Sequence, residues 1–370
     1  MKNIFLIVPK LYPCDIGGLE IFFYYLVNEL KNEYNIWLFT NCRKFKLNDI
    51  NGNNIQIMFS NNLISLNPSF ESLLGILINL IKIRKKLDYI LVPYTSNSIL
   101  IYPILIFYSI FKIPYLISIH GGGLYSWKPY FIHKYFFRKA KHIIAASLEI
   151  KKEYESRADR KVIYIPPLIP FNKQIESKKD LKTKYGLDQT TKVIIVVGSI
   201  KKIKGSIELL EGFMQLGKDF IDENNLKLIF AGEGSMKKSL EKIVKERKFR
   251  KYVKFFGNLP HEKIHEIYGM ADIYIIASYF EGTPISLLEA MFNGLPIIGS
   301  DVMGINNLIN NYENGLLFES KNSLDLAQKI KLIVSDDKLA KKLGAKAKED
   351  YLRNYSIDKV VSEYKKLLEK

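Results

Sequence analysis

The sequence predicts an α/β protein of two doubly wound domains, each with a parallel sheet between layers of helices. Short apolar runs alternate with amphipathic stretches along the whole chain, which is typical of repeated strand–helix units around parallel sheets. The segment Ile165-Pro166-Pro167-Leu168-Ile169-Pro170 holds three prolines and interrupts this alternation. The length of 370 residues suits two domains of ordinary size.

The first domain is predicted to span residues 1–168 and to hold the first series of strands and helices. The expected strands are Ile4–Val8, Ile36–Thr40, Ile55–Phe59, Tyr89–Val92, Tyr115–His120, Ile143–Ala146 and Val162–Ile165. The expected helices are Leu19–Leu30, Glu71–Leu87, Ile99–Phe111, Tyr130–Lys141 and Leu148–Glu155. Glu71–Leu87 has one thin polar stripe on a mostly apolar surface, which favours a helix packed on a sheet over one lying on a membrane.

The second domain is predicted to span residues 169–352, after a polar, lysine-rich linker at Asn172–Lys192. Its expected strands are Lys192–Val197, Leu226–Ala231, Val253–Phe256, Ile273–Ala277, Pro296–Gly299 and Gly315–Phe318. Its expected helices are Gly205–Leu216, Met236–Lys245, Glu262–Met270, Pro284–Asn293 and Ser323–Val334, and two more close the chain at Lys338–Tyr351 and Ile357–Glu369. Because ligands bind at the carboxyl ends of strands in such sheets, we expect a site in a cleft between the domains.

The composition excludes several classes of protein. Hydrophobic residues make up 48% and charged residues 25%, which rules out a disordered or low-complexity chain. Two cysteines are too few for a disulfide framework or a four-thiolate zinc site, and they indicate a reducing compartment. The apolar start Ile4–Val8 is too short for a secretory signal, and Ile99–Phe111 is too short to span a bilayer about 30 Å thick. We therefore predict a cytoplasmic protein that is soluble or lies on the membrane surface.

The net charge of +17 is unevenly distributed. The stretch 89–148 has no acidic residue, and its basic residues are Lys112, Lys128, Lys134, Arg138, Lys139 and Lys141. Aromatic residues are interleaved with them, including Tyr125, Trp127, Tyr130, Phe131, Tyr135, Phe136 and Phe137. This pattern suits an anionic partner such as a phospholipid surface, a polyprenyl phosphate or an acidic glycan; the alternative is a lysine-rich solvated surface with the rings in the core. Arginine is scarce, so a nucleic-acid partner is not expected.

Four junctions between a strand and the next helix hold residues suited to binding. Gly17-Gly18 and the lysine loop Gly198–Gly205 could both bring backbone or lysine donors to a phosphate, although each could be an ordinary turn. His120 ends a strand before three glycines, where substrates bind in this architecture, or it is a structural histidine. Glu281 and Glu289 could accept hydrogen bonds from sugar and ribose hydroxyls, or be carboxylates favoured at a helix start.

The last of these junctions resembles the E-x(7)-E motif of retaining glycosyltransferases of family 4, in the form E-G-x-P-x-x-x-x-E from Glu281 to Glu289. The flanking matches are ordered as in that family and reach from the start of the chain to about residue 320. They are Gly17-Gly18, His120, Ala145-Ala146-Ser147, Lys204-Gly205, Ala231-Gly232-Glu233-Gly234, Ala271-Asp272, Ala290-Met291, Gly294-Leu295-Pro296 and Asn314-Gly315-Leu316-Leu317. The resemblance implies the GT-B fold, with a first domain that binds acceptor, a second that binds nucleotide sugar, and a last helix at about 353–370 that packs back on the first domain.

The resemblance also implies roles for individual residues. Catalytic roles fall to His120 beside the transferred sugar, Glu281 on the donor-sugar hydroxyls and Lys204 on the diphosphate, and Glu289 would bind the ribose hydroxyls. The donor-binding residues implied are Gly17, Gly18, Ser199, Lys201, Lys204, Gly232, Gly234, Glu281, Gly282, Thr283, Pro284, Ile285 and Glu289. No metal and no other cofactor is expected, since the family needs none and the chain has no D-x-D pair. The nucleotide sugar is a co-substrate.

Three positions depart from the family pattern and concern the phosphate contacts. Ser199 stands where the family often has arginine, so Lys201 or Lys202 supplies the second charge or the phosphate is held differently. Pro166-Pro167-Leu168 replaces the common P-N-G, and Asn307 replaces a frequent glutamate. The expected function is transfer of a hexose-type sugar from a nucleotide-diphosphate sugar to a glycan or lipid-linked acceptor in cell-surface glycan synthesis. The alternatives are a GT-B sugar-nucleotide epimerase or phosphorylase, or a catalytically silent binding subunit.

Overall fold

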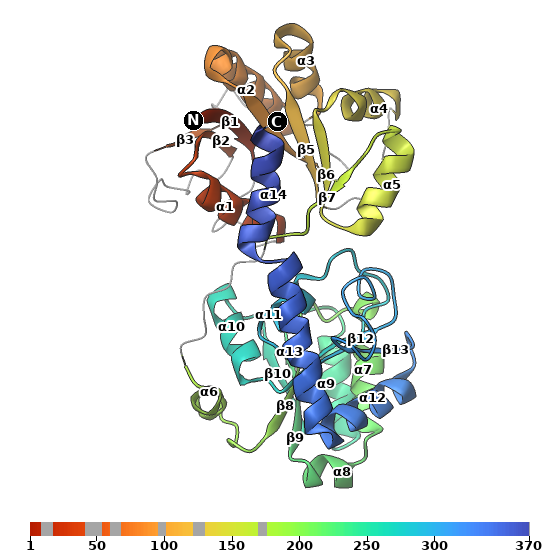
Figure 1. Cartoon of the computed structure of the whole chain (residues 1–370). Helices are drawn as coiled ribbons and strands as arrows, with labels where there is room; N and C mark the ends of the chain where they lie inside the picture. The colour runs from red at the N-terminus through yellow and green to blue at the C-terminus, as the bar shows by residue number, and fades with distance from the viewer. Residues whose placement is uncertain are drawn as a thin grey trace. The chain divides into compact units, whose positions relative to one another are not determined.

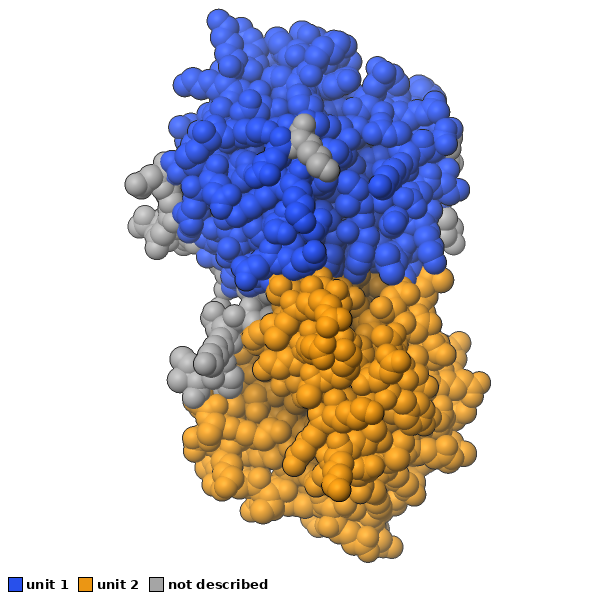
Figure 2. All heavy atoms as spheres, in the orientation of Figure 1, with its two compact units in different colours: residues 1–169, 357–370 blue, residues 170–356 orange. Residues whose placement is uncertain are grey.

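The chain divides into two compact units in the computed structural model, which describes residues 1–8, 18–40, 54–59, 68–94, 101–120, 130–168 and 176–369. Unit 1 holds residues 1–169 and 357–370, and unit 2 holds residues 170–356; Figure 2 colours them separately. The segment that returns to unit 1 begins at Ile357 and not at about 353. The reason is that the preceding helix, α13 (Asp337–Asn354), continues through Asn354.

Unit 1 is built on a parallel sheet with the strand order β3-β2-β1-β4-β5-β6-β7 (Figure 1). Its strands are β1 (Lys2–Ile7), β2 (Tyr34–Thr40), β3 (Ile55–Phe59), β4 (Tyr89–Tyr94), β5 (Tyr115–Ile119), β6 (His142–Ala145) and β7 (Ile163–Tyr164). Its helices are α1 (Gly18–Leu30), α2 (Pro68–Ile83), α3 (Ile101–Phe111), α4 (Tyr130–Lys139), α5 (Leu148–Ala158) and the C-terminal α14 (Ile357–Glu369). A short 3-10 helix, η2 (Arg84–Lys86), follows α2.

Successive side chains of β1 enter two different cores, one on each face of this sheet. Ile4 and Leu6 pack in a cluster that includes residues of α1 and α14, whereas Phe5 and Ile7 pack in a second cluster with residues of α2 to α5. A strand places alternate side chains on opposite faces, so a strand that is buried on both faces must be apolar throughout. This explains the unbroken apolar run at the start of the chain.

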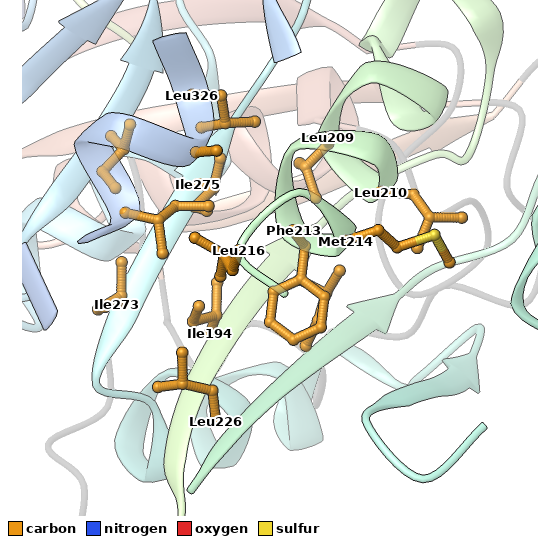
Figure 3. Packing of buried hydrophobic residues seen from close by; sticks show 14 of the residues in the cluster. Ile194, Leu209, Leu210, Phe213, Met214, Leu216, Leu226, Ile273, Ile275 and Leu326 are labelled. Atoms are coloured by element: carbon orange, nitrogen blue, oxygen red, sulfur yellow. The ribbon is translucent and has the colours of Figure 1, made fainter. Parts of the chain in front are cut away.

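Unit 2 repeats this plan with the parallel strand order β10-β9-β8-β11-β12-β13. Its strands are β8 (Lys192–Val197), β9 (Leu226–Ala231), β10 (Val253–Gly257), β11 (Ile273–Ile276), β12 (Ile297–Ser300) and β13 (Leu316–Phe318). Its helices are α6 (Lys178–Lys184), η3 (Lys202–Lys204), α7 (Ser206–Met214), α8 (Lys218–Glu223), α9 (Lys237–Glu246), α10 (His261–Met270), α11 (Ile285–Phe292), α12 (Ser323–Ser335) and α13. Figure 3 shows Phe213 of α7 near Ile194 of β8, and both belong to the core of this unit.

The predicted linker at Asn172–Lys192 is wrong at Lys178–Lys184, because these residues form α6, which packs on α10. Ser177 caps the helix by accepting from the backbone N–H of Asp180, and Leu181 is fully buried. The ammonium of Lys182 donates to Thr191 O at 2.7 Å and to Asp272 Oδ2 at 2.9 Å. The lysine-rich composition therefore serves a docked helix, in which Lys178, Lys182 and Lys184 form ion pairs with carboxylates.

The prediction of two doubly wound parallel-sheet domains is confirmed. The strand order reverses between β1 and β4 in unit 1 and between β8 and β11 in unit 2. Such switch points create a crevice outside the carboxyl ends of the strands, where ligands bind in this class of fold. Within the described ranges, none of the helices has the length and apolar character needed to cross a bilayer.

Candidate active site

Unit 2 has a pocket of about 390 Å³ at its switch point, between the loops that follow β8 and β11. The predicted site residues that line it are Ser199, Lys204, Glu281, Thr283, Pro284, Ile285 and Glu289. Lys201 is exposed and does not line this pocket, nor do Gly232, Gly234 and Gly282. The loops after β8 and β11, two neighbouring strands, thus supply most of the predicted residues in the wall. This agrees with the expectation that ligands bind at the carboxyl ends of parallel strands.

The loop after β8 lies directly against the loop after β11. The backbone N–H of Tyr279 donates to Ile203 O at 2.9 Å. Gly205 has a positive φ of 61°, and a Cβ built there would stand 2.0 Å from Ala277 O. Since no side chain fits that gap, glycine at 205 is required to hold Lys204 at the pocket wall.

Gly232 and Gly234 support the same loop from the side of β9. A Cβ on Gly232 would lie 1.9 Å from Gly198 O, and one on Gly234 would lie 2.2 Å from Ile200 O. The backbone N–H of Ile200 donates to Glu233 O at 2.9 Å, which ties the two loops together. These two glycines therefore shape the lysine loop through its backbone.

Lys204 and Glu281 form an ion pair in the pocket wall. Lys204 Nζ lies 2.5 Å from Glu281 Oε1, and the Ser278 hydroxyl donates to the same oxygen at 2.6 Å. The Glu281 side chain is 13% exposed and that of Lys204 is 34% exposed, so both reach the pocket with limited access to water. The family resemblance implies that these two residues bind different parts of one ligand, and in this structure they are in contact with each other.

Glu289 projects from α11 and is buried, with 5% of its surface exposed. The Tyr268 hydroxyl lies 2.7 Å from Glu289 Oε2 and 3.0 Å from Ser286 O, and it can donate to either. Burial raises the pKa of Glu289 to about 7, and the hydrogen bond from Tyr268 offsets part of that rise. Glu289 lines the pocket, and among the described residues no hydrogen bond reaches its Oε1 atom, so this oxygen can still accept one.

The start of α11 completes the pocket wall. Pro284 precedes the helix, and no side chain caps its first turn. The first backbone N–H groups of a helix have no partner within the helix and favour an anion. Tyr274 fixes this turn by donating to Ser286 Oγ at 2.8 Å.

His120 belongs to unit 1 and follows β5 directly. Its imidazole is half-buried against Phe22 and Phe23, with ring centroids 4.4 and 5.3 Å away. Burial lowers the pKa of His120 to about 3, so the ring is neutral at ordinary pH. Ser118 Oγ lies 2.8 Å from its Nε2 atom.

Two residues of the predicted site remain, Gly17 and Gly18. Gly18 is the first residue of α1, whereas Gly17 lies outside the described residues, as do the glycines at 121–123.

The sequence did not predict Tyr268 as a partner of Glu289 or Ser118 as a partner of His120. Ser118 could have been found, because residues i and i+2 of a strand share a face; Tyr268 has no such signal.

Two family models match consecutive parts of this chain. Residues 177–350 match the model described as "Glycosyl transferases group 1", and residues 16–173 match "Glycosyltransferase Family 4". The chain belongs to the family 4 glycosyltransferases. The resemblance predicted from the E-x(7)-E motif and its flanks is therefore confirmed at the level of the family.

Relatives and solved structures agree with this assignment. An uncharacterized glycosyltransferase of Methanocaldococcus jannaschii is 29% identical over 269 residues, which is 68% of each chain. The N-acetyl-alpha-D-glucosaminyl L-malate synthase of Bacillus anthracis is 26% identical over 52% of this chain and 50% of its own. The structure of HepE from Anabaena in complex with UDP and glucose superposes with a TM-score of 0.76, 16% identity and full coverage of both chains. The fold of this glycosyltransferase is thus GT-B.

Proposed function

We propose that this glycosyltransferase is a retaining enzyme that moves a hexose-type sugar from a nucleotide-diphosphate sugar to a glycan or lipid-linked acceptor in cell-surface glycan synthesis. The observation that carries the proposal is the pocket of unit 2, where Lys204, Glu281 and Glu289 converge at the start of α11. The solved relative HepE holds UDP and glucose, which supports a nucleotide-sugar donor.

The ion pair suggests how donor binding reorganises the site. A diphosphate near the first turn of α11 competes with Glu281 for the ammonium of Lys204, because both are anionic acceptors. Once Lys204 turns to the phosphate, the Glu281 carboxylate accepts hydrogen bonds from donor-sugar hydroxyls. Lys204 and the helix N–H groups then stabilise the charge that develops on the leaving nucleoside diphosphate.

A donor screen tests this function. The protein is mixed with UDP-, GDP- and ADP-sugars, and its melting temperature and nucleotide release are followed. A donor at 100 times its dissociation constant stabilises the folded state by about 2.7 kcal/mol. Analysis of the product separates the alternatives: a transferase yields a new glycosidic bond with the donor's anomeric configuration, an epimerase yields an altered sugar, and a silent subunit yields neither.

Glu289→Ala tests the ribose contact. The variant should weaken donor binding by about tenfold, the size of one or two hydrogen bonds, with a smaller effect on turnover of bound donor. Tyr268 keeps Ser286 O as an acceptor, so the change leaves no buried hydroxyl without a partner. Glu241→Ala, on the exposed side of α9, is the matched control. Unchanged calorimetric affinity in a folded Glu289→Ala protein would remove Glu289 from the site.

We also propose that unit 1 attaches to an anionic membrane surface from the cytoplasm. Tyr102, Ile106 and Ile110 recur every four residues on α3, and their side chains are 37%, 49% and 64% exposed. On the neighbouring α4, Phe131 is 71% exposed, and the exposed basic residues nearby include Lys112 and Lys139. An apolar stripe with basic residues around it suits the interface of an anionic leaflet.

The structure divides the aromatic residues of the acid-free stretch into two groups. Phe136 and Phe137 are fully buried in unit 1, as the alternative of core rings expects, whereas Phe131 and Tyr135 are exposed. Tyr125 and Trp127 lie outside the described residues.

Co-sedimentation with vesicles tests the membrane proposal. Binding should need anionic lipid, weaken in high salt, and fall when Ile106 and Ile110 become glutamate. Leu352→Glu, at an exposed apolar position of unit 2, is the control. Equal recovery with neutral and anionic vesicles would leave a soluble enzyme with a lysine-rich surface.

A further inference from the structure

A buried hydrogen-bonded chain in unit 1 ends on His120. Ser118 Oγ lies 2.8 Å from His120 Nε2 and 2.8 Å from the Tyr364 hydroxyl. Ser118 is on β5 and Tyr364 is on α14, 246 residues later, and their side chains are 0% and 1% exposed. The C-terminal helix thus contacts the strand-end histidine through one hydroxyl.

The direction of this chain follows from its proton count. Each hydroxyl has one proton to donate. In the described part of the chain, Ser118 Oγ has no side-chain partners besides these two, and the Tyr364 hydroxyl has Ser118 alone. If Ser118 donated to Tyr364, the phenol proton would be buried without an acceptor, which is unfavourable. Both protons are used only if Tyr364 donates to Ser118 and Ser118 donates to His120 Nε2.

The surroundings of the ring support this direction. A neutral imidazole has one protonated nitrogen, so an accepting Nε2 places the proton on Nδ1. Phe22 lies against both the imidazole and the Tyr364 ring, with centroid distances of 4.4 and 5.9 Å. Such apolar walls disfavour a charged ring, in agreement with the lowered pKa of His120.

We propose that Ser118 and Tyr364 are positioning residues that hold His120 as the neutral Nδ1–H tautomer, with Nδ1–H available as a donor to a substrate oxygen. The part that concerns substrate rests on the proposed function; the tautomer does not. Through this chain, α14 determines the tautomer of a residue at the carboxyl edge of the sheet in unit 1.

The tautomer is measured by long-range ¹H–¹⁵N correlation spectra of the full-length, ¹⁵N-labelled protein at pH 7, with the His120 signals identified by their loss in His120→Gln. The wild-type ring should show a protonated Nδ1. Tyr364→Phe removes the donor to Ser118, so Ser118 can accept from Nε2–H, and the Nε2–H form should gain population. Tyr115→Phe is the matched control, since Tyr115 is a buried tyrosine of the same strand whose hydroxyl donates to Phe136 O.

Kinetics test the positioning role separately. Tyr364→Phe and Ser118→Ala should each lower kcat by about fivefold to tenfold, the effect of one hydrogen bond, with little change in KM for the donor. Residues that act as one unit are not additive, so the double variant should lose no more than either single variant.

The outcomes separate the two proposals. A wild-type ring protonated at Nε2, or a tautomer unchanged by both Tyr364→Phe and Ser118→Ala, would overturn the positioning chain whatever the enzyme's activity. A changed tautomer with full turnover would show that the chain plays no part in the reaction. The donor screen, not these spectra, decides whether the proposed function stands.

Discussion

The carboxyl edges of the two sheets hold polar side chains in contrasting ways. In unit 2, opposite charges meet, as the ammonium of Lys204 lies 2.5 Å from the carboxylate of Glu281. In unit 1, Tyr364, Ser118 and His120 form a chain of neutral groups. A neutral chain needs no counter-charge to be buried, whereas a buried charge requires a partner.

This difference suits two tasks. A charged pair can exchange its internal contact for contacts with a ligand, because the ammonium of Lys204 can pair with a phosphate while the carboxylate of Glu281 accepts hydrogen bonds from sugar hydroxyls. A neutral donor can bind an uncharged hydroxyl without attracting phosphate. We therefore expect substitutions in the pocket of unit 2 to weaken stabilisation of the leaving diphosphate. Substitutions in the hydrogen-bonded chain of unit 1 should instead change how the substrate is oriented.

The largest effect should follow from Lys204→Met. It removes the cation that stabilises the leaving group, so turnover should fall by about 10²- to 10³-fold in a nucleotide-release assay. Lys201→Met is the matched control, because Lys201 is an exposed lysine of the same loop. An equal loss in both variants would mean that the whole loop supplies the charge, and the ion pair would have no special role.

Gly205→Ala should cause the next largest change, in stability. Its new Cβ would clash with Ala277 O, and its φ of 61° is unfavourable for alanine, so unfolding free energy should fall by about 3 kcal/mol or more. Gly186→Ala has a similar φ of 65° but nothing within 4 Å, so it should cost only about 1–2 kcal/mol. Denaturant unfolding measures both. Equal losses would show that the contact between the two loops of the pocket is dispensable.

Most of the fold was predictable because strands that are buried on both faces form continuous apolar runs. The expected strand at Leu226–Ala231 has the observed bounds, and β8 begins and ends as predicted. The helix α6 was not predicted, because it has a single apolar residue, Leu181, and depends on Asp272, ninety residues later, for the charge that pairs with Lys182.

The site was predictable where its residues are close in sequence. The spacing of Glu281 and Glu289 places both on one loop and helix, and the carboxyl-end rule brings Lys204 to them. The contacts of Tyr268 with Glu289 and of Tyr364 with Ser118 join elements that no local pattern relates. They arise from packing of whole helices, which a single sequence does not reveal.

Buried Glu289 and half-buried His120 should give opposite pH dependence of stability. For Glu289 the folded pKa of about 7 exceeds the usual value of about 4.5, so the unfolded chain loses its proton first and stability falls as pH rises from 4.5 to 7, by about 3 kcal/mol at most. For His120 the folded pKa of about 3 is below the usual 6.5, so the unfolded chain binds the extra proton and stability rises between pH 3 and 6.5.

Two variants separate these contributions between pH 5 and 7. When the pH is lowered from 7 to 5, the unfolding free energy of Glu289→Gln should rise less than that of wild type, because the variant cannot gain from protonation of Glu289. That of His120→Gln should fall less than that of wild type. Denaturant unfolding at both pH values measures these changes. If the unfolding free energy of both variants changes with pH as that of wild type does, neither Glu289 nor His120 is held in its neutral form by the fold. The two sheet edges would then differ only in the ion pair of unit 2.

The smallest expected effect is that of chelation, which should leave turnover unchanged. In glycosyl transfer the leaving diphosphate needs positive charge, and a divalent metal or fixed protein groups can provide it. Here Lys204 and the uncapped first turn of α11 lie at one pocket, so the fixed groups are sufficient in our proposal. Turnover with the best donor is measured before and after EDTA treatment, with a metal-dependent glycosyltransferase as the positive control for chelation. If EDTA abolishes turnover and Mg²⁺ or Mn²⁺ restores it, the charge on the leaving group is met by a metal, and the exchange of Lys204 from Glu281 to the phosphate is wrong.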